Sequence, residues 1–214
     1  MSETAGHDST DLSATIGSFA DLVAEGTPSP GGGSVSAYCG VLAASLGQMV
    51  CNLTIGKKKY EQAEGRVIEI RSELERLGHR LRRLIAEDAA SFDRVLAAYR
   101  LPKETEEQRG ERARRIEEAG RGAARTPLET AERSAEVLRL LEELAKIGNQ
   151  NALSDAAVGG QLAFAAIKGA HYNVAVNLGM LPETEAAELR QRMTGTGEES
   201  LARLASLEGL ASQG

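Results

Sequence analysis

The chain has 214 residues, of which 42% are apolar and 26% are charged, a composition ordinary for a folded globular protein. Its formal net charge is −6 and only 3% of its residues are aromatic, which argues against a general nucleic-acid-binding surface. The two cysteines, Cys39 and Cys51, lie on one apolar stretch where they could not face each other, and they indicate reduced thiols of a cytoplasmic protein.

The N-terminal region is polar and acidic, with neither a basic start nor an apolar signal core. We therefore expect residues 1–13 to form a disordered tail and residues 14–210 to form one helical domain. Apolar residues at helical spacing predict a short first helix over 16–23, which ends at Gly26. Prolines and glycines make the next segment, 27–33, non-helical.

An uncharged segment follows from residue 35 to residue 55, and it is long enough to span a bilayer, for which ~20 apolar residues suffice. A helix buried in a soluble bundle explains the segment better, because lipid would leave Gln48 and Asn52 without partners. We expect Ser34 to be the N-cap of this helix and Gly56 to end it. The small residues on one face, which let another helix approach closely, are Ser36, Gly40 and Ala44.

Residues 60–99 predict a much longer helix with an apolar seam that steps alternately by three and four residues. The seam consists of Val67, Ile70, Leu74, Leu77, Leu81 and Leu84. Asp88 takes the next seam position, where packing favours leucine, and apolar residues resume beyond it. Burial raises the pKa of a carboxylate unless a cation or hydrogen bonds offset it, so Asp88 suits acid–base chemistry or a cationic ligand.

The remaining sequence predicts further helices. Leu101-Pro102 breaks the long helix, and a charge-rich helix with a solvated outer face follows over 106–124. Thr126-Pro127 predicts the start of another helix, which ends near Gly148. A small-residue helix over 154–178 and a final amphipathic pair between 182 and 210 complete the chain. Strand patterns are nearly absent, so the predicted fold is an all-α, single-domain bundle of long antiparallel helices.

Common metal and phosphate motifs are missing. The three histidines, His7, His79 and His171, lack the local partners of a common zinc site, so no metal is expected. Gly56-Lys57-Lys58 lacks the hydroxyl residue and the preceding strand of a phosphate loop.

Two features beside the buried helix could bind a polar or anionic ligand. The glycines at 31–33 lead into a helix N-terminus whose N–H groups can face a ligand, although from the glycines alone a flexible connector is the favoured interpretation. Lysines 57–59 suit a ligand with carboxylates or phosphates, and a solvated helix C-terminus explains them equally well.

A third candidate site combines Asp88 with polar residues at and along the small-residue helix. These residues are Asn149, Ser154, Asp155, Asn173 and Asn177. The alternative is a buried hydrogen-bonded cluster, and it is favoured for Asp155, which suits the first turn of its helix. For Asp88 the functional interpretation is favoured.

Several blocks between about Phe19 and Leu178 resemble the formiminotetrahydrofolate cyclodeaminase and methenyltetrahydrofolate cyclohydrolase family. The first blocks are the segment Thr-Pro-Ser-Pro-Gly-Gly-Gly-Ser at 27–34 and the run Met49 to Tyr60. The later blocks are Glu87-Asp88 with Phe92, Leu101-Pro102-Lys103, Gly148-Asn149 with Ser154-Asp155, and Asn173-Val174 with Asn177. The resemblance implies an all-helical homodimer with a folate site near the subunit interface and no cofactor beyond the tetrahydrofolate substrate.

Two chemistries divide that family, and both pass through a tetrahedral carbon between N5 and N10 of tetrahydrofolate. The run 49–60 resembles the free-standing bacterial cyclohydrolases, and no formiminotransferase domain is fused here. The expected activity is therefore hydrolysis of 5,10-methenyltetrahydrofolate to 10-formyltetrahydrofolate. Cyclisation of 5-formiminotetrahydrofolate with loss of ammonia is the alternative, and a non-catalytic folate-binding or scaffold protein is a second one.

The resemblance also assigns roles. The expected catalytic residues are Asp88, Asp155 and Lys57. Asp88 would hold the positive charge of the methenyl bridge while a carboxylate or an ordered polar group deprotonates the attacking water, with Asp155 as the alternative base. Lys57 and Lys58 would hold the glutamate tail. The expected substrate-binding residues are Pro30, Gly31, Gly32, Gly33, Ser34, Lys58, Tyr60, Asn149, Ser154 and Asn173. The expected partners are a folate and a second copy of the chain, with no nucleic acid and no membrane.

Overall fold

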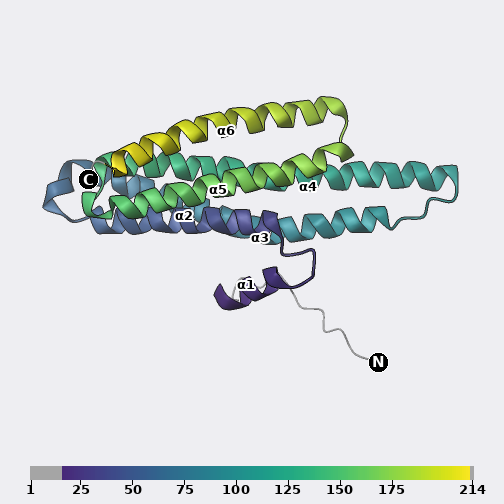
Figure 1. Ribbon diagram of the computed structural model, residues 1–214, viewed down its shortest axis with the longest axis horizontal. Helices are drawn as coiled ribbons and strands as arrows, with labels where there is room; N and C mark the ends of the chain where they lie inside the picture. Colours follow the sequence, from purple (N-terminus) through teal and green to yellow (C-terminus); the bar gives the residue numbers. More distant parts are fainter. Residues whose placement is uncertain (1–15, 213–214) are drawn as a thin grey trace.

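The computed structural model describes residues 16–212, and all regular structure within that range is helical (Figure 1). The α-helices are α1 (Ile16–Ala24), α2 (Gly32–Thr54), α3 (Glu64–Tyr99), α4 (Glu106–Ile147), α5 (Leu153–Asn177) and α6 (Glu183–Ala211). The short 3-10 helices are η1 (Lys58–Ala63), η2 (Gln150–Ala152) and η3 (Leu178–Met180). The predicted all-α class is confirmed. The predicted tail, residues 1–13, lies outside the described residues.

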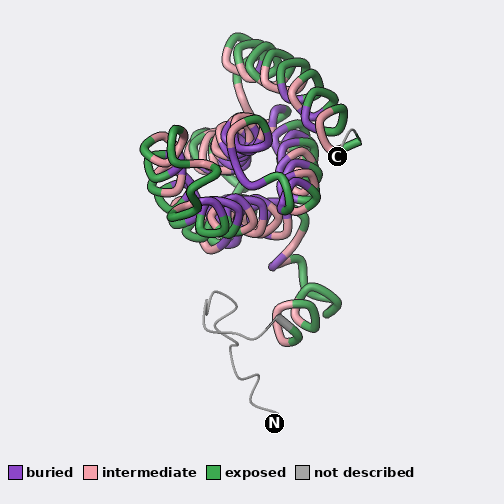
Figure 2. Tube along the Cα trace, turned by 90° about the vertical axis from the view of Figure 1, so that its left-hand side faces the viewer, coloured by how far each residue is buried: buried purple, intermediate pink, exposed green. Residues whose placement is uncertain are grey.

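Four long helices form the bundle. α2 packs against α3 and α5, and α4 packs against the same two helices (Figure 1). Buried residues line the inside of this arrangement, whereas α6 lies outside it against α4 and α5 (Figure 2). The α3–α4 hairpin extends well past the ends of α2 and α5 (Figure 1).

The core follows the predicted seam. All of its residues from Val67 to Leu84 are fully buried. α2 is the one helix among the described residues that is long and apolar enough to cross a membrane. Its buried side chains belong to the main core, and Gly40 shows how closely its neighbours approach, because a Cβ there would lie 2.7 Å from the Oγ of Ser134. The interpretation of this segment as a buried core helix agrees with that packing.

Two predicted boundaries differ in the structure. α2 begins at Gly32 with Gly31 at the N-cap position, so the prediction of Ser34 as N-cap was wrong. The Ser34 side chain instead donates a hydrogen bond to Asp88 of α3, as described below. The final amphipathic pair is one continuous helix, α6, that includes Gly195 and Gly197. A glycine costs only ~1 kcal/mol relative to alanine inside a helix, and Gly197 packs against the His171 ring of α5.

The predicted break before Pro127 was also wrong, because α4 runs through this proline from Glu106 to Ile147. Proline has no N–H, so the carbonyl of Ala123 loses its ordinary helical donor. The Nδ2 of Asn177, at the end of α5, donates a hydrogen bond of 3.0 Å to that carbonyl oxygen. A tertiary contact therefore replaces the missing helical bond and allows α4 to continue.

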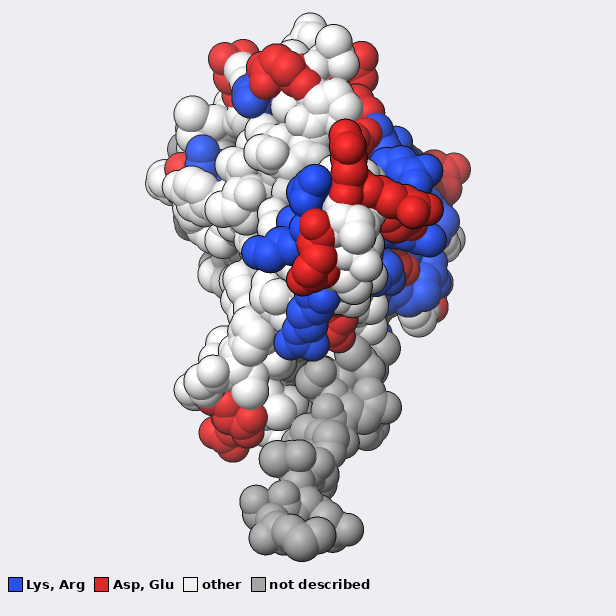
Figure 3. Space-filling model, turned by 90° about the vertical axis from the view of Figure 1, so that its right-hand side faces the viewer, with Lys and Arg blue, Asp and Glu red and all other residues white. Residues whose placement is uncertain are grey.

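The charge-rich start of α4 is solvated, as expected. Figure 3 looks at the hairpin end of the molecule and shows Lys and Arg side chains interspersed with Asp and Glu. Ion pairs within the helix, such as Arg115–Glu111 and Arg115–Glu118, account for part of this pattern. Exposed pairs of this kind contribute little to stability.

Candidate active site

Asp88 of α3 faces the N-terminus of α2. The Oγ of Ser34 donates a hydrogen bond of 3.0 Å to the Oδ2 of Asp88 and also lies 3.3 Å from the carbonyl oxygen of Ile85. Burial raises the pKa of Asp88 above its ordinary value, and hydrogen bonds from the side chain and backbone of Ser34 act in the opposite direction. The carboxyl group therefore takes part in capping α2 while it remains titratable.

Gly33 allows this approach. A Cβ at Gly33 would lie 2.2 Å from the Oδ1 of Asp88, which no side chain could tolerate. The glycine turn is therefore required by the closeness of a carboxylate and is more than a flexible connector. In the first turn of a helix the N–H groups have no helical acceptor, so the N–H groups of Gly32 and Gly33 can meet an added ligand.

A cavity of about 220 Å³ opens beside this contact. It is lined by Pro28, Ser29, Gly31, Gly32, Gly33, Asp88, Ser91, Phe92, Val95, Ala123, Asn173, Val176 and Asn177. Residues from the glycine turn, α3, α4 and α5 therefore converge on one space. Of the predicted site residues, the glycines at 31–33, Asp88 and Asn173 line this cavity. Ser34 contacts Asp88, and Pro30 is buried in the glycine turn.

The remaining predicted residues lie at the other end of the bundle. Tyr60 accepts a hydrogen bond of 3.1 Å from the N–H of Gln150 and donates one of 3.4 Å to the Oδ1 of Asn149. Asn149 is buried, and its N–H donates to the Oγ1 of Thr54 at 2.9 Å. The hydrogen bond from Gln150 lowers the pKa of Tyr60. Tyr60 and Asn149 thus connect η1 to the junction between α4 and α5.

The lysines extend from this connection into solvent. Lys57 and Lys58 are exposed and line a shallow hollow of about 360 Å³ with Gly56, Glu61 and Glu64. Gly56 adopts a positive φ of 78°, which favours glycine at this turn. Ser154 is exposed and Asp155 is half-buried in the first turn of α5.

Within one chain, the residues around Lys57 and Asp155 lie far from the residues around the Asp88 cavity. Asp155 and Asn173 both lie on α5, and at ~1.5 Å of rise per residue they are about 27 Å apart along its axis. In Figure 1 the glycine turn and η1 lie at opposite ends of α2. The lysines and Asp155 therefore cannot contact a small ligand that is bound at Asp88 of the same subunit.

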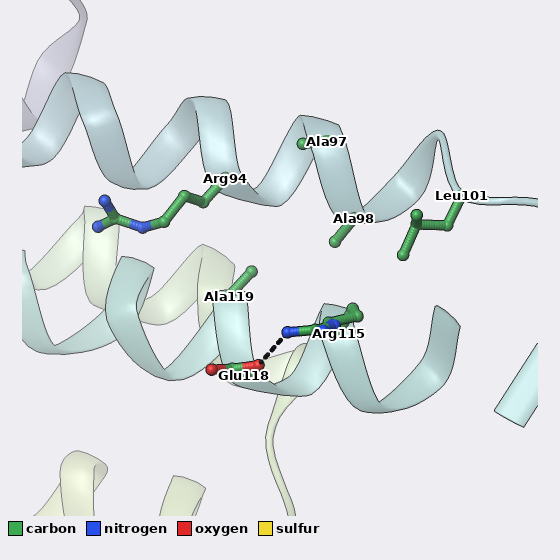
Figure 4. A pocket seen from close by; sticks show the side chains of 7 residues that line it. All are labelled: Arg94, Ala97, Ala98, Leu101, Arg115, Glu118 and Ala119. Carbon is green, nitrogen blue, oxygen red and sulfur yellow. Dashed lines mark hydrogen bonds and ion pairs between the residues drawn. The ribbon is translucent and has the colours of Figure 1, made fainter. Parts of the chain in front are cut away.

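A larger cavity of about 450 Å³ lies between the end of α3 and the start of α4 (Figure 4). Its walls are mostly alanine and leucine, with Arg94 along one edge and an Arg115–Glu118 ion pair of 3.3 Å at another. None of the predicted site residues lines it. The smaller cavity, which is lined by the titratable carboxyl group and by the glycines of the first turn of α2, is the better candidate active site.

Ser29, Val95, Ala123 and Val176 line the cavity but were not predicted as site residues. Asn177 belonged to the predicted polar cluster without an assigned role. No local pattern marks Ala123 or Val176, because they reach the cavity only through helix packing. Within residues 16–212, no group of three or more His, Cys, Asp or Glu side chains could hold a metal ion.

Comparisons with known proteins match the chain to one family. The family model described as formiminotransferase-cyclodeaminase matches residues 15–194. A methenyltetrahydrofolate cyclohydrolase from Methylorubrum extorquens is 40% identical over 176 residues, which cover 82% of this chain and 85% of the relative. A formimidoyltransferase-cyclodeaminase from Rattus norvegicus is 30% identical over 199 residues, 92% of this chain but only 37% of the relative.

A solved structure has the same fold. The crystal structure of formiminotetrahydrofolate cyclodeaminase from Thermotoga maritima matches with a TM-score of 0.84 and 26% identity. The match covers 94% of this chain and 97% of the crystallised one.

Proposed function

The chain belongs to the formiminotransferase-cyclodeaminase family, and from that membership we propose that it is an enzyme that hydrolyses 5,10-methenyltetrahydrofolate to 10-formyltetrahydrofolate. The cyclohydrolase relative supports hydrolysis because it is 40% identical over most of both chains. The cyclodeaminase relatives are more distant and keep the ammonia-releasing cyclisation as the alternative.

One observation carries the mechanism: a partly buried carboxyl group with a raised pKa lines a cavity at the N-terminus of a helix. The substrate carries a positive charge shared between N5, the bridging carbon and N10. The carboxylate form of Asp88 attracts this charge, and a raised pKa makes it a stronger base toward water. Hydrolysis then needs one water molecule placed between Asp88 and the bridging carbon.

The steps balance without an added cofactor. Water attacks the bridging carbon and gives one proton to Asp88, which leaves a neutral tetrahedral hydroxyl adduct. The bond between N5 and carbon then breaks, N5 takes up a proton from Asp88, and the hydroxyl proton leaves as the formyl C=O forms on N10. Gly32 and Gly33 line the same cavity, and the N–H groups of a helix's first turn can stabilise the developing oxygen charge.

Lys57, Lys58 and Asp155 lie far from the Asp88 cavity of their own chain, and a homodimer would bring the two groups together. Large apolar side chains are exposed on α2 at Met49 and Leu53, and on α5 at Tyr172 and Val176. In each pair the residues are four apart and share one helix face. We propose that two chains pair antiparallel through these faces, because a two-fold interface buries the same patch on both subunits. This arrangement would bring the partner's Lys57, the partner's Lys58 and the partner's Asp155 toward the Asp88 cavity.

In this arrangement Lys57 and Lys58 bind the carboxylates of the glutamate tail, and Tyr60 with Asn149 fixes the segment that carries them. We expect longer tails to bind more tightly, and we expect a cytoplasmic location. Asp88 is placed ahead of Asp155 as the base because it lines the cavity of its own subunit.

The test is an assay with both family substrates. Purified protein is mixed with 5,10-methenyltetrahydrofolate, and the loss of its near-ultraviolet absorbance is compared with the spontaneous rate. Faster loss, with no ammonia released from 5-formiminotetrahydrofolate, is the expected result. Ammonia release with accumulation of the methenyl compound would instead establish the cyclodeaminase, and no reaction with either substrate would overturn the assignment as an enzyme.

A further inference from the structure

Asn173 and Asn177 of α5 line the candidate cavity, and their hydrogen bonds fix the orientation of both side-chain amides. The Nδ2 of Asn173 donates to the carbonyl oxygen of Gly169 at 2.8 Å. The Nδ2 of Asn177 donates to the carbonyl oxygens of Ala123 at 3.0 Å and Asn173 at 2.7 Å. Carbonyl oxygens only accept hydrogen bonds, so the amide nitrogens must face them. Both Oδ1 atoms are therefore left as the acceptors available to a ligand.

Pro127 explains why the Asn177 amide is held in this orientation. The proline leaves the Ala123 carbonyl without its helical donor, and a buried carbonyl without a partner is costly. Asn177 supplies the donor, and Ala123 itself lines the cavity. Because Asn173 and Asn177 are four residues apart on one helix, both oxygens lie on the same side of α5.

Ser29 adds a third polar group. Ser29 is one of the residues that line the same cavity, and its Oγ is buried and has no hydrogen-bond partner within residues 16–212. A buried hydroxyl of this kind needs a partner, and a ligand can supply one. The cavity thus offers two amide oxygens as acceptors, an unpaired hydroxyl and the N–H groups at the start of α2.

This pattern complements the pyrimidinone edge of a pterin. That edge carries the 2-amino group and N3–H as neighbouring donors, followed by the 4-oxo group as an acceptor. A cavity of about 220 Å³ is smaller than the ~300 Å³ lower limit for drug-sized ligands, so it suits one ring system and leaves the rest of a folate outside. Phe92 on the cavity wall can pack against the face of such a ring.

Resting on the function proposed above, we propose that Asn173 and Asn177 read the 2-amino and N3–H donors of the pterin ring, with Asn177 as the specificity-determining residue. Ser29 then meets the 4-oxo group. A site with fixed acceptors rejects a ligand that presents an oxygen in place of a donor, because two acceptors would face each other without a hydrogen.

The experiment compares 6-methylpterin with 6-methyllumazine, which has a 2-oxo group where the pterin has the 2-amino group. Binding of each fluorescent compound to the full-length protein is measured by titration. The parent protein is expected to bind the pterin about tenfold or more tightly than the lumazine. The variant Asn177→Ala is expected to reduce that preference to within about twofold. Asn52→Ala removes an exposed asparagine of α2 and should keep the parent preference.

Equal binding of the two compounds by the parent would overturn the proposal, and this comparison needs no variant to fold. A preference that survives in Asn177→Ala would overturn the role of Asn177. The outcomes distinguish this inference from the proposed function. Equal binding of the two compounds, together with hydrolysis of methenyltetrahydrofolate, would contradict only this inference. Selective binding of the pterin without hydrolysis would contradict only the assignment as an enzyme.

Discussion

The Oδ1 of Asp88 lies 2.2 Å from the position that a Cβ at Gly33 would occupy. The carboxyl group and the N-terminus of α2 can therefore meet only because residue 33 has no side chain. Ser34, one residue later, donates its hydroxyl to the other carboxyl oxygen at 3.0 Å. The glycine turn and Asp88 thus form one structural unit, although 54 residues separate Ser34 from Asp88 in the sequence.

The substitution Gly33→Ala should displace Asp88 from this contact. We expect kcat for hydrolysis of methenyltetrahydrofolate to fall by about 100-fold, the scale at which displaced catalytic groups lose rate. Steady-state kinetics measures this change. Gly26→Ala is the matched control, because a Cβ there meets nothing within 4 Å, and equal losses in both variants would contradict the explanation.

The substitution Ser34→Ala should move the acid limb of the pH–rate profile. The hydrogen bonds from Ser34 oppose the effect of burial on Asp88, so removing the hydroxyl raises the pKa of Asp88 further. The carboxylate form is the base, so the rate is lost as pH falls through this pKa. The acid limb should therefore shift to higher pH, and a shift to lower pH would show that Ser34 acts differently.

The substitution Lys58→Ala should weaken binding of the glutamate tail. We expect KM for a polyglutamylated substrate to rise about two- to fivefold with kcat nearly unchanged, since exposed ion pairs contribute ~0.2–1 kcal/mol. The increase should be smaller for the monoglutamate and should shrink at high salt. Lys103→Ala, in the distant α3–α4 connection, serves as the control, and an equal rise in that variant would argue against a specific tail site.

The substitution Leu53→Asp should disrupt the proposed dimer. Leu53 is 41% exposed on α2, and Ile68, at 40% exposed on α3, offers a control of equal exposure outside the proposed interface. Light scattering should show a dimer for the parent and Ile68→Asp and a monomer for Leu53→Asp. Activity should fall only in the monomeric variant. A Leu53→Asp protein that stays dimeric would place the interface elsewhere.

The sequence was sufficient to predict the all-α class and the buried seam, because a three-and-four apolar repeat depends on local spacing. It failed at Pro127, because the continuation of α4 depends on Asn177, which lies in another helix and 54 residues away from Ala123. Asp88 was predicted as a polar interruption of the seam, and the structure places it in a cavity. Lys57, Lys58 and Asp155 were predicted as part of the same site, but Asp155 and Asn173 are 18 residues apart on one continuous helix, α5, which puts the two groups at opposite ends of the bundle.

The most direct test of the account compares Asp88→Asn with the parent in hydrolysis of methenyltetrahydrofolate. Asp93→Asn, an exposed aspartate on the same helix, is the control. We predict that kcat of Asp88→Asn falls by about 100-fold or more, the usual contribution of a general base, while Asp93→Asn keeps the parent rate. Turnover of Asp88→Asn within a few-fold of the parent, with the loss found instead in Asp155→Asn, would contradict the assignment of Asp88 as the base.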